Sequence, residues 1–220
     1  MHVYDDLEFL SARRFAYRMF QRLLGDEPAP ELLAAIDVEV ARAAFEVMGG
    51  PLAEGKGEEL CALIADADGD AEVLASEYVR LFVGPAALPA APWESVYRDS
   101  QRTIMTKTTL DVRNAYRAQG FIPRLYPRVP DDHIALELDF LASLADEAVD
   151  ACEREDAAGC RAALEASGRF AEEHLGTWAG AFACDMREKG DSAFYAAVAD
   201  ALASFVAADA ERLGAAADGI

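Results

Sequence analysis

The sequence predicts an all-α fold, arranged as a single-domain bundle of about eight to ten helices. Apolar residues recur at spacings of three and four along most of the chain, whereas the alternation typical of strands is nearly absent. Glycine and proline fall between these apolar-periodic segments, where helices end and begin. A chain of 220 residues can bury a sizeable core, so residues 1–220 are assigned to one domain.

Four helices are predicted in the first part of the chain, over residues 5–24, 30–48, 57–67 and 70–83. In the first of them, Leu10, Tyr17 and Leu24 recur at seven-residue spacing and mark one apolar face. Gly84 and Pro85 end the fourth, because glycine accepts a positive φ and proline cannot continue a helix.

The second part is predicted to contain helices over residues 100–119 and 131–155, one or two within 159–189, and a last one ending near 213. Gly120 closes the first of these, and a proline-containing linker over residues 121–130 forms a waist. A bend is expected near Gly168 or Gly176, and residues 214–220 are expected to fray.

A proline-rich crossover, residues 81–97, joins the two parts and is unusually apolar for a loop. Irregular backbone needs partners for its hydrogen bonds, so most loops are polar and lie in water. This one either packs against helices or forms an apolar surface that a partner covers. Its apolar side chains are Leu81, Phe82, Val83, Leu88, Trp93, Val96 and Tyr97.

The net charge of −20 would repel phosphate backbones, so nucleic acid is excluded as a partner. Residues 97–129 nevertheless carry +5, and the remainder therefore carries −25. Either the basic segment is neutralised by acidic helices, or the acidic remainder attracts a cationic peptide. The basic residues are Arg98, Arg102, Lys107, Arg113, Arg117, Arg124 and Arg128, against Asp99 and Asp111.

The sequence predicts a cytoplasmic protein. No apolar run is judged long enough to span a bilayer, and the N-terminus has neither the basic nor the apolar region of a signal peptide. The cysteines show no Cys-x-x-Cys pairing and are expected to be reduced and to bind no metal.

Asp131, Asp132, His133 and Glu137 form the best candidate for chemistry. Asp131 after Pro130 is predicted to be the N-cap of the next helix, with His133 in its first turn and Glu137 packed against it. The alternative is a metal-dependent helical hydrolase that uses Asp132, His133 and Glu137. No phosphate loop, nucleophile elbow or Cys/His pair is found, so the chain is predicted not to be an enzyme and no cofactor is assigned.

Two glutamates, Glu77 and Glu94, bracket the crossover. Each either accepts backbone N–H groups of the irregular segment or meets an arginine of a partner. Further on, His174 and Trp178 with Phe182 form an aromatic group at helical spacing, which indicates core packing.

Four segments together resemble the TorD/DmsD family of molybdoenzyme maturation chaperones, to which NarJ is related. The segments are Glu77-Tyr-Val-Arg-Leu-Phe-Val-Gly-Pro85, Ala91-Pro-Trp-Glu-Ser-Val-Tyr97, Pro130-Asp-Asp-His133 and His174-Leu-x-x-Trp178. The similarity extends over about residues 77–206, and the first seventy residues match only in helical character. Valine stands before Pro130, where the family commonly has an acidic residue, and the crossover carries an extra Ala-rich stretch.

The resemblance implies a cytoplasmic chaperone of anaerobic respiration that binds the twin-arginine signal peptide and the apo form of a molybdopterin oxidoreductase. It would delay export until the cofactor is inserted, and it would contact the export machinery. The family also implies a monomer or a domain-swapped dimer, and guanine nucleotide binding is not assumed. The implied peptide-binding residues are Trp93, Ser95, Val96, Tyr97, Leu110, Gly120, Asp132 and His133. The implied supporting residues are Glu77, Tyr78, Leu81, Phe82, Gly84, Pro85, Glu94, Glu137, His174 and Trp178.

Overall fold

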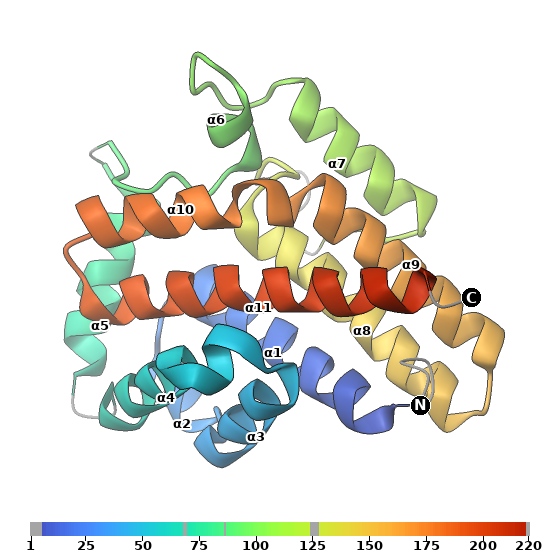
Figure 1. The fold of residues 1–220 in the computed structure, drawn as a ribbon. Coiled ribbons are helices and arrows are strands. Elements are labelled where there is room, and N and C mark those ends of the chain that lie inside the picture. Colours follow the sequence, from blue (N-terminus) through green and yellow to red (C-terminus); the bar gives the residue numbers. More distant parts are fainter. Residues whose placement is uncertain (1–5, 68–69, 86, 124–127, 219–220) are drawn as a thin grey trace.

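The computed structural model describes residues 6–67, 70–85, 87–123 and 128–218, with side chains up to residue 214. Helices account for almost all regular structure in this part of the chain, which confirms the all-α prediction (Figure 1). The helices are α1 (Leu7–Gly25), α2 (Pro30–Ala34), α3 (Val38–Met48), α4 (Gly57–Asp66), α5 (Ala71–Tyr78), α6 (Glu94–Arg98), α7 (Lys107–Ala118), α8 (Ile134–Glu153), α9 (Ala157–Glu173), α10 (Leu175–Lys189) and α11 (Ala193–Asp218), with π-helical turns at Leu52–Lys56 and Val79–Val83.

The core is built by α1, α8, α9, α10 and α11. Helix α1 packs along α8, α8 and α9 form a hairpin, and α10 returns along α11 (Figure 1). Gly25 at the end of α1 allows its closest approach to α8, since a Cβ on Gly25 would lie 2.9 Å from the Cβ of Ala135. The apolar periodicity of the sequence therefore becomes one continuous core rather than several small ones.

A buried ionic cluster, formed by Arg13, Tyr17, Ser167 and Asp209, joins α1, α9 and α11. Nη2 of Arg13 donates to Oδ2 of Asp209 at 2.9 Å and to Oγ of Ser167 at 2.7 Å. The hydroxyl of Tyr17 donates to the same carboxylate at 2.6 Å. Burial by itself lowers the pKa of Arg13, but the Asp209 carboxylate raises it above its ordinary value, so the Arg13 guanidinium stays charged.

Some helix boundaries differ from the prediction. The segment 30–48 forms two helices, because the Asp37 side chain caps a new helix by accepting from the backbone N–H of Glu39 and Val40. Residues 99–106 are not helical, and Arg102 and Met105 have φ of 53° and 60°. Helix α11 continues to Asp218, so the expected fraying from residue 214 is wrong.

The segment 159–189 contains two helices separated at His174, whose φ and ψ are −125° and −98°. Of the two expected bends, the one near Gly176 is therefore confirmed and the one near Gly168 is not. A Cβ on Gly176 would lie 2.6 Å from the backbone oxygen of Ala171, so the sharp junction needs a residue without a side chain.

Helix α11 corrects the expectation about apolar length. Its segment Ala193–Gly214, of 22 residues, is long and apolar enough to cross a membrane by length and composition alone. In the bundle 56% of its most apolar stretch is buried against neighbouring helices. Core helices of globular proteins pass the same test, so the segment is weak evidence for a membrane span.

Candidate functional site

The crossover and the start of α8 are joined by a short antiparallel bridge between Trp93 and His133. The backbone N–H of Glu94 donates to the carbonyl of Asp132 at 3.0 Å, and that of Ile134 donates to the carbonyl of Pro92 at 2.9 Å. Two of the segments that carry the family resemblance therefore lie side by side, although about forty residues separate them in the sequence. We call this region, residues 92–98 and 131–137, the α6/α8 junction.

Asp132 holds α6 in place from inside the junction. Its Oδ2 accepts the backbone N–H of Ser95 at 2.9 Å, and both side chains are fully buried. This contact satisfies one of the free N–H groups at the start of α6, a helix that the sequence did not predict because it is only five residues long.

The N-cap of α8 is His133. The sequence had predicted Asp131 in this position, and that prediction is wrong. Nδ1 of His133 accepts the backbone N–H of Ala135 at 3.1 Å. Asp131 turns instead toward α7, where Arg113 donates to its carboxylate at 2.6 Å and Tyr116 donates to its backbone carbonyl at 2.9 Å. The ion pair with Arg113 stabilises Asp131 more than a local N-cap contact would, since it neutralises a carboxylate that is only 2% exposed.

The His133 ring lies edge-on to Trp93, with the ring centroids 5.5 Å apart. Burial lowers the pKa of His133 to about 4, although the neighbouring Asp132 acts in the opposite direction. His133 is therefore neutral at physiological pH, and its ring serves as a half-buried aromatic surface beside Trp93.

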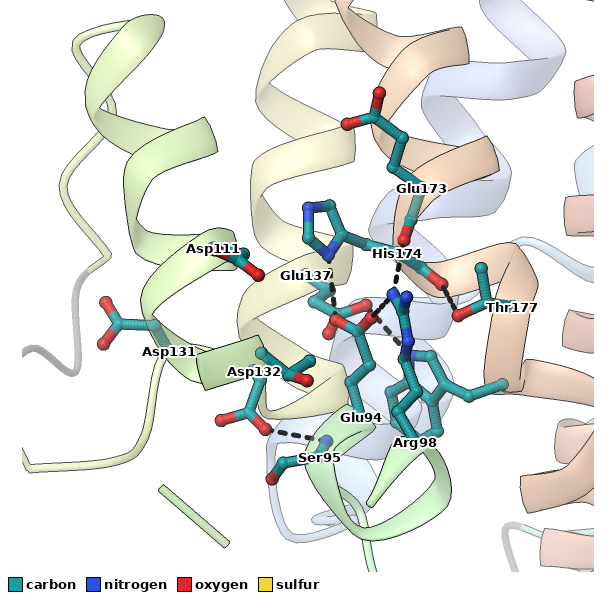
Figure 2. A network of polar contacts seen from close by, with 12 residues as sticks. Glu94, Ser95, Arg98, Asp111, Asp131, Asp132, Glu137, Glu173, His174 and Thr177 are labelled. Carbon is teal, nitrogen blue, oxygen red and sulfur yellow. Dashed lines mark hydrogen bonds and ion pairs between the residues drawn. The ribbon is translucent and has the colours of Figure 1, made fainter. Parts of the chain in front are cut away.

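A buried group of acidic and aromatic side chains lies behind this surface (Figure 2). Oε2 of Glu94 lies 3.0 Å from Nδ1 of His174, and Nε1 of Trp178 donates to Oε2 of Glu137 at 3.2 Å. Burial and the nearby Glu94 carboxylate raise the pKa of Glu137 well above its ordinary value. The expected pairing of Glu137 with His133 is thus wrong, because Glu137 points into the bundle toward α10.

The implied peptide-binding residues differ in their exposure. Ser95, Val96 and Asp132 are buried, and Trp93, Tyr97 and His133 are partly buried. Leu110 is 54% exposed on α7, and Gly120 is exposed at the end of that helix with a φ of 68°. Six of these eight residues thus gather at the α6/α8 junction, and two lie on α7.

The implied supporting residues mostly serve packing. Leu81 and Phe82 belong to the core, Tyr78 packs against it, and Trp178 stacks on Tyr97 with ring centroids 5.4 Å apart. Gly84 has a φ of 96°, as predicted. The remaining members are placed as follows: Glu77 accepts the hydroxyl of Ser192, His174 and Trp178 are buried, and Pro85 is exposed. The prediction that His174, Trp178 and Phe182 belong to the core is confirmed.

The junction also carries unusual unpaired polar atoms. Among the described residues, eight buried side-chain polar atoms have no hydrogen-bond partner, and five of them lie in the junction: Nε1 of Trp93, Oγ of Ser95, the hydroxyl oxygen of Tyr97, Oδ1 of Asp132 and Oε1 of Glu137. Buried polar groups are normally paired, since each unpaired one costs about 1–3 kcal/mol. Such a concentration distinguishes this junction from the rest of the described bundle.

The basic segment 97–129 is neutralised largely within the chain, as the first of the two interpretations expected. Its side chains form ion pairs in the order Arg98–Glu94, Arg102–Asp185, Lys107–Asp111 and Arg113–Asp131. Arg124 lies outside the described residues. Sequence reasoning missed the Glu94–Arg98 pair, although the spacing of four residues was a usable signal.

Nothing supports the hydrolase alternative. Within residues 6–67, 70–85, 87–123 and 128–218, no group of three or more His, Cys, Asp or Glu side chains is placed to hold a metal ion. The Nδ1 atom of His133 is used as the cap of α8, which leaves only Nε2 of this ring for another partner.

These features define an all-α bundle in which buried carboxylates hold the short helix α6 against the start of the long helix α8. The family described as nitrate reductase delta subunit matches residues 51–184, and the chain belongs to that family. The match contains all four resembling segments in full.

The chain is similar to curated chaperones. It is 33% identical over 136 residues to the chaperone protein TorD of Vibrio cholerae, a match that covers 62% of this chain and 60% of that relative. It is 36% identical over 75 residues to the Tat proofreading chaperone DmsD of Salmonella typhi, covering 34% of this chain and 37% of that one. Both relatives are named as chaperones and not as enzymes, in agreement with the prediction.

The fold is also found in a solved structure. A protein from Archaeoglobus fulgidus, described as a redox enzyme maturation protein, superposes with a TM-score of 0.52 at 21% identity. The superposition covers 94% of this chain and 95% of that one, so the whole described bundle takes part.

Proposed function

We propose that the protein is a cytoplasmic chaperone for a molybdopterin oxidoreductase of the dimethyl-sulfoxide-reductase type, and that it binds the twin-arginine signal peptide of this client. Binding would hold the apo client back from the export machinery until the cofactor has been inserted. The family membership and the names of the relatives support the class. As before, residues 1–220 are taken to act as one domain.

The observation that carries the proposal is the set of unpaired polar atoms at the α6/α8 junction. A peptide has N–H and C=O groups of its own, and it could satisfy Nε1 of Trp93 and Oδ1 of Asp132 once they are uncovered. The partly buried rings of Trp93 and His133 would then pack against its apolar residues. Family members that bind such peptides would be expected to keep polar groups in this place.

The charges and areas agree with reversible binding. A twin-arginine signal has a basic region followed by a moderately apolar one, and a protein of net charge −20 attracts the first. Burying about 300 Å² of apolar surface contributes about 7 kcal/mol before ordering costs remove several of these. Micromolar binding needs about 8 kcal/mol in total, so contacts with the basic region of the signal must supply the remainder, and a client bound at this affinity can still be released.

A titration with synthetic peptide tests the proposal. A synthetic twin-arginine signal peptide of a molybdopterin oxidoreductase should bind saturably, and Trp93→Ala and His133→Ala should weaken binding about tenfold while the helical circular dichroism signal stays nearly unchanged. Val73→Ala is the control, because Val73 is 56% exposed on α5 and lies outside the junction. Absence of saturable binding to the native protein would refute the function.

Loss of helical signal in both variants would refute the assignment of these two residues instead, because it would show that they act through folding alone.

A further inference from the structure

The side chain of Arg98, the last residue of α6, fills a binding position for a guanidinium group (Figure 2). Its Nη1 donates to Oε1 of Glu94 at 2.7 Å and to the backbone carbonyl of Glu173 at 2.8 Å. The Glu94 side chain is 0% exposed, whereas that of Arg98 is 43% exposed. Arg98 is therefore the outer member of the pair, and it covers a carboxylate that would otherwise face solvent.

The break between α9 and α10 supplies the second acceptor. The last carbonyls of a helix have no partners within that helix, and α9 ends at Glu173. The non-helical conformation of His174 leaves the Glu173 carbonyl available to Arg98. Both hydrogen bonds come from the one nitrogen Nη1, and the Glu94 carboxylate that accepts one of them is 0% exposed. A guanidinium is more weakly hydrated than an ammonium group, so it loses less hydration on entering such a buried site.

The surroundings favour an additional positive charge. Oδ1 of Asp132 is unpaired, whereas Glu137, whose pKa is raised well above its ordinary value, is a polar neighbour of Glu94 rather than a second source of charge. The carboxylate of Glu173 makes no hydrogen bond or ion pair with any described residue. An adjoining groove of about 460 Å³ between α7 and α9 is lined by Glu173, His174, Asp111 and Arg169, and Asp111 is already paired with Lys107.

We infer that the Glu94 carboxylate and the Glu173 carbonyl form an arginine-recognition site, which Arg98 occupies in the peptide-free protein and which one arginine of the client signal takes over. The inference rests on the proposed function, which does not say where the arginines bind. The rest of the basic region would lie at the end of the α7/α9 groove that carries the Glu173 carboxylate.

An internal arginine in this position has a consequence for affinity. A client arginine must displace Arg98, so the apparent affinity equals the intrinsic affinity multiplied by the fraction of molecules in which Arg98 has left the site. Removing the Arg98 side chain should therefore strengthen binding, the opposite of what truncating an ordinary contact residue does.

The test compares Arg98→Ala with the native protein by calorimetric titration with the twin-arginine peptide and its twin-lysine counterpart. We expect about tenfold tighter binding of the arginine peptide and a smaller gain for the lysine peptide. Arg187→Ala is the matched control, because Arg187 is also about half exposed (54%) and also makes one carboxylate pair, with Asp200 at 2.7 Å. Its affinities should stay at the native values.

Equal or weaker binding of the arginine peptide by Arg98→Ala, with an unchanged preference over the lysine peptide, would overturn the inference and leave the proposed function intact. A second measurement does not depend on the peptide. Millimolar N-methylguanidinium should raise the melting temperature of Arg98→Ala more than methylammonium does, and it should have no such effect on the native protein.

If the two small cations act alike on Arg98→Ala, the recognition site is refuted. If N-methylguanidinium acts selectively while no twin-arginine peptide binds either protein, the guanidinium site stands and the proposed function fails.

Discussion

Two buried polar clusters in this bundle show opposite designs. In the first, Asp209 accepts from Arg13 and Tyr17, and the only unpaired atom is Nη1 of Arg13. In the second, at the α6/α8 junction, Glu94, Asp132 and Glu137 are all 0% exposed, and two of these carboxyl groups have an unpaired oxygen. The first cluster has nearly matched charge, whereas the second has an excess of acid.

The difference indicates what each cluster does. A buried ion pair with nearly complete hydrogen bonding fixes the relative position of the helices that carry it. A cluster with unpaired carboxylates costs free energy in the peptide-free protein, and a ligand that supplies donors recovers that cost. We therefore expect substitutions in the first cluster to affect stability alone, and substitutions in the second to affect binding and pH dependence.

Asp209→Ala tests the first cluster most severely. Removing the carboxylate leaves the Arg13 guanidinium buried without a counter-ion, which should lower the free energy of unfolding by about 3–5 kcal/mol. Urea denaturation measures this loss. The double variant Arg13→Met with Asp209→Leu should recover most of it, because no uncompensated charge remains. A loss below about 1 kcal/mol in the single variant would remove the contrast between the clusters.

Glu137→Gln tests the second cluster. The pKa of Glu137 is raised in the folded protein, so its contribution to stability is complete at low pH and is lost as the pH rises above the ordinary glutamate value. The neutral amide can still accept from Trp178, and it escapes this loss. Between pH 5 and pH 8, the free energy of unfolding of the variant should rise by about 1 kcal/mol or more relative to that of the native protein. The opposite trend in urea denaturation would show that Glu137 is ionised and well paired.

His133→Asn should have the smallest effect. Asparagine caps helices well but does not titrate. Because the pKa of His133 is lowered to about 4, its contribution to stability is complete above about pH 6.5 and is lost as the pH falls toward 4. Between pH 7.5 and pH 5, the free energy of unfolding of the native protein should fall by about 1 kcal/mol relative to that of the variant. The expected difference is small because the His133 ring is only partly buried. Parallel pH profiles of the two proteins would contradict this.

The helical fold could be predicted from the sequence because it depends on local patterns. Seven-residue recurrence of Leu10, Tyr17 and Leu24 marked the buried face of α1, and the structure buries all three. Gly84 was correctly placed at positive φ, and Gly120, which was predicted to close the preceding helix, also has a positive φ, because only the local backbone decides that conformation. The composition of the His174–Trp178 segment indicated the core for the same reason, since large aromatic side chains at helical spacing rarely remain exposed.

The partners of charged side chains could not be predicted in this way. Asp131 had the position of an N-cap, but an arginine eighteen residues away in sequence takes its carboxylate, and His133 caps the helix instead. Glu94 meets a histidine eighty residues further on, a pairing for which the sequence holds no signal. Electrostatic energies depend on distance and burial in three dimensions. Sequence spacing predicts which side chains are neighbours only within about one helical turn.

The sequence by itself thus determined the helices, the apolar character of the crossover and the resemblance to a chaperone family, because each is carried by residues close together in the chain. Only the tertiary structure decided that the crossover and the start of α8 share a backbone bridge, and that their carboxylates lie buried and partly unpaired. The physical reason is that burying a charged group is costly, so its partner is chosen by the folded arrangement of the whole bundle.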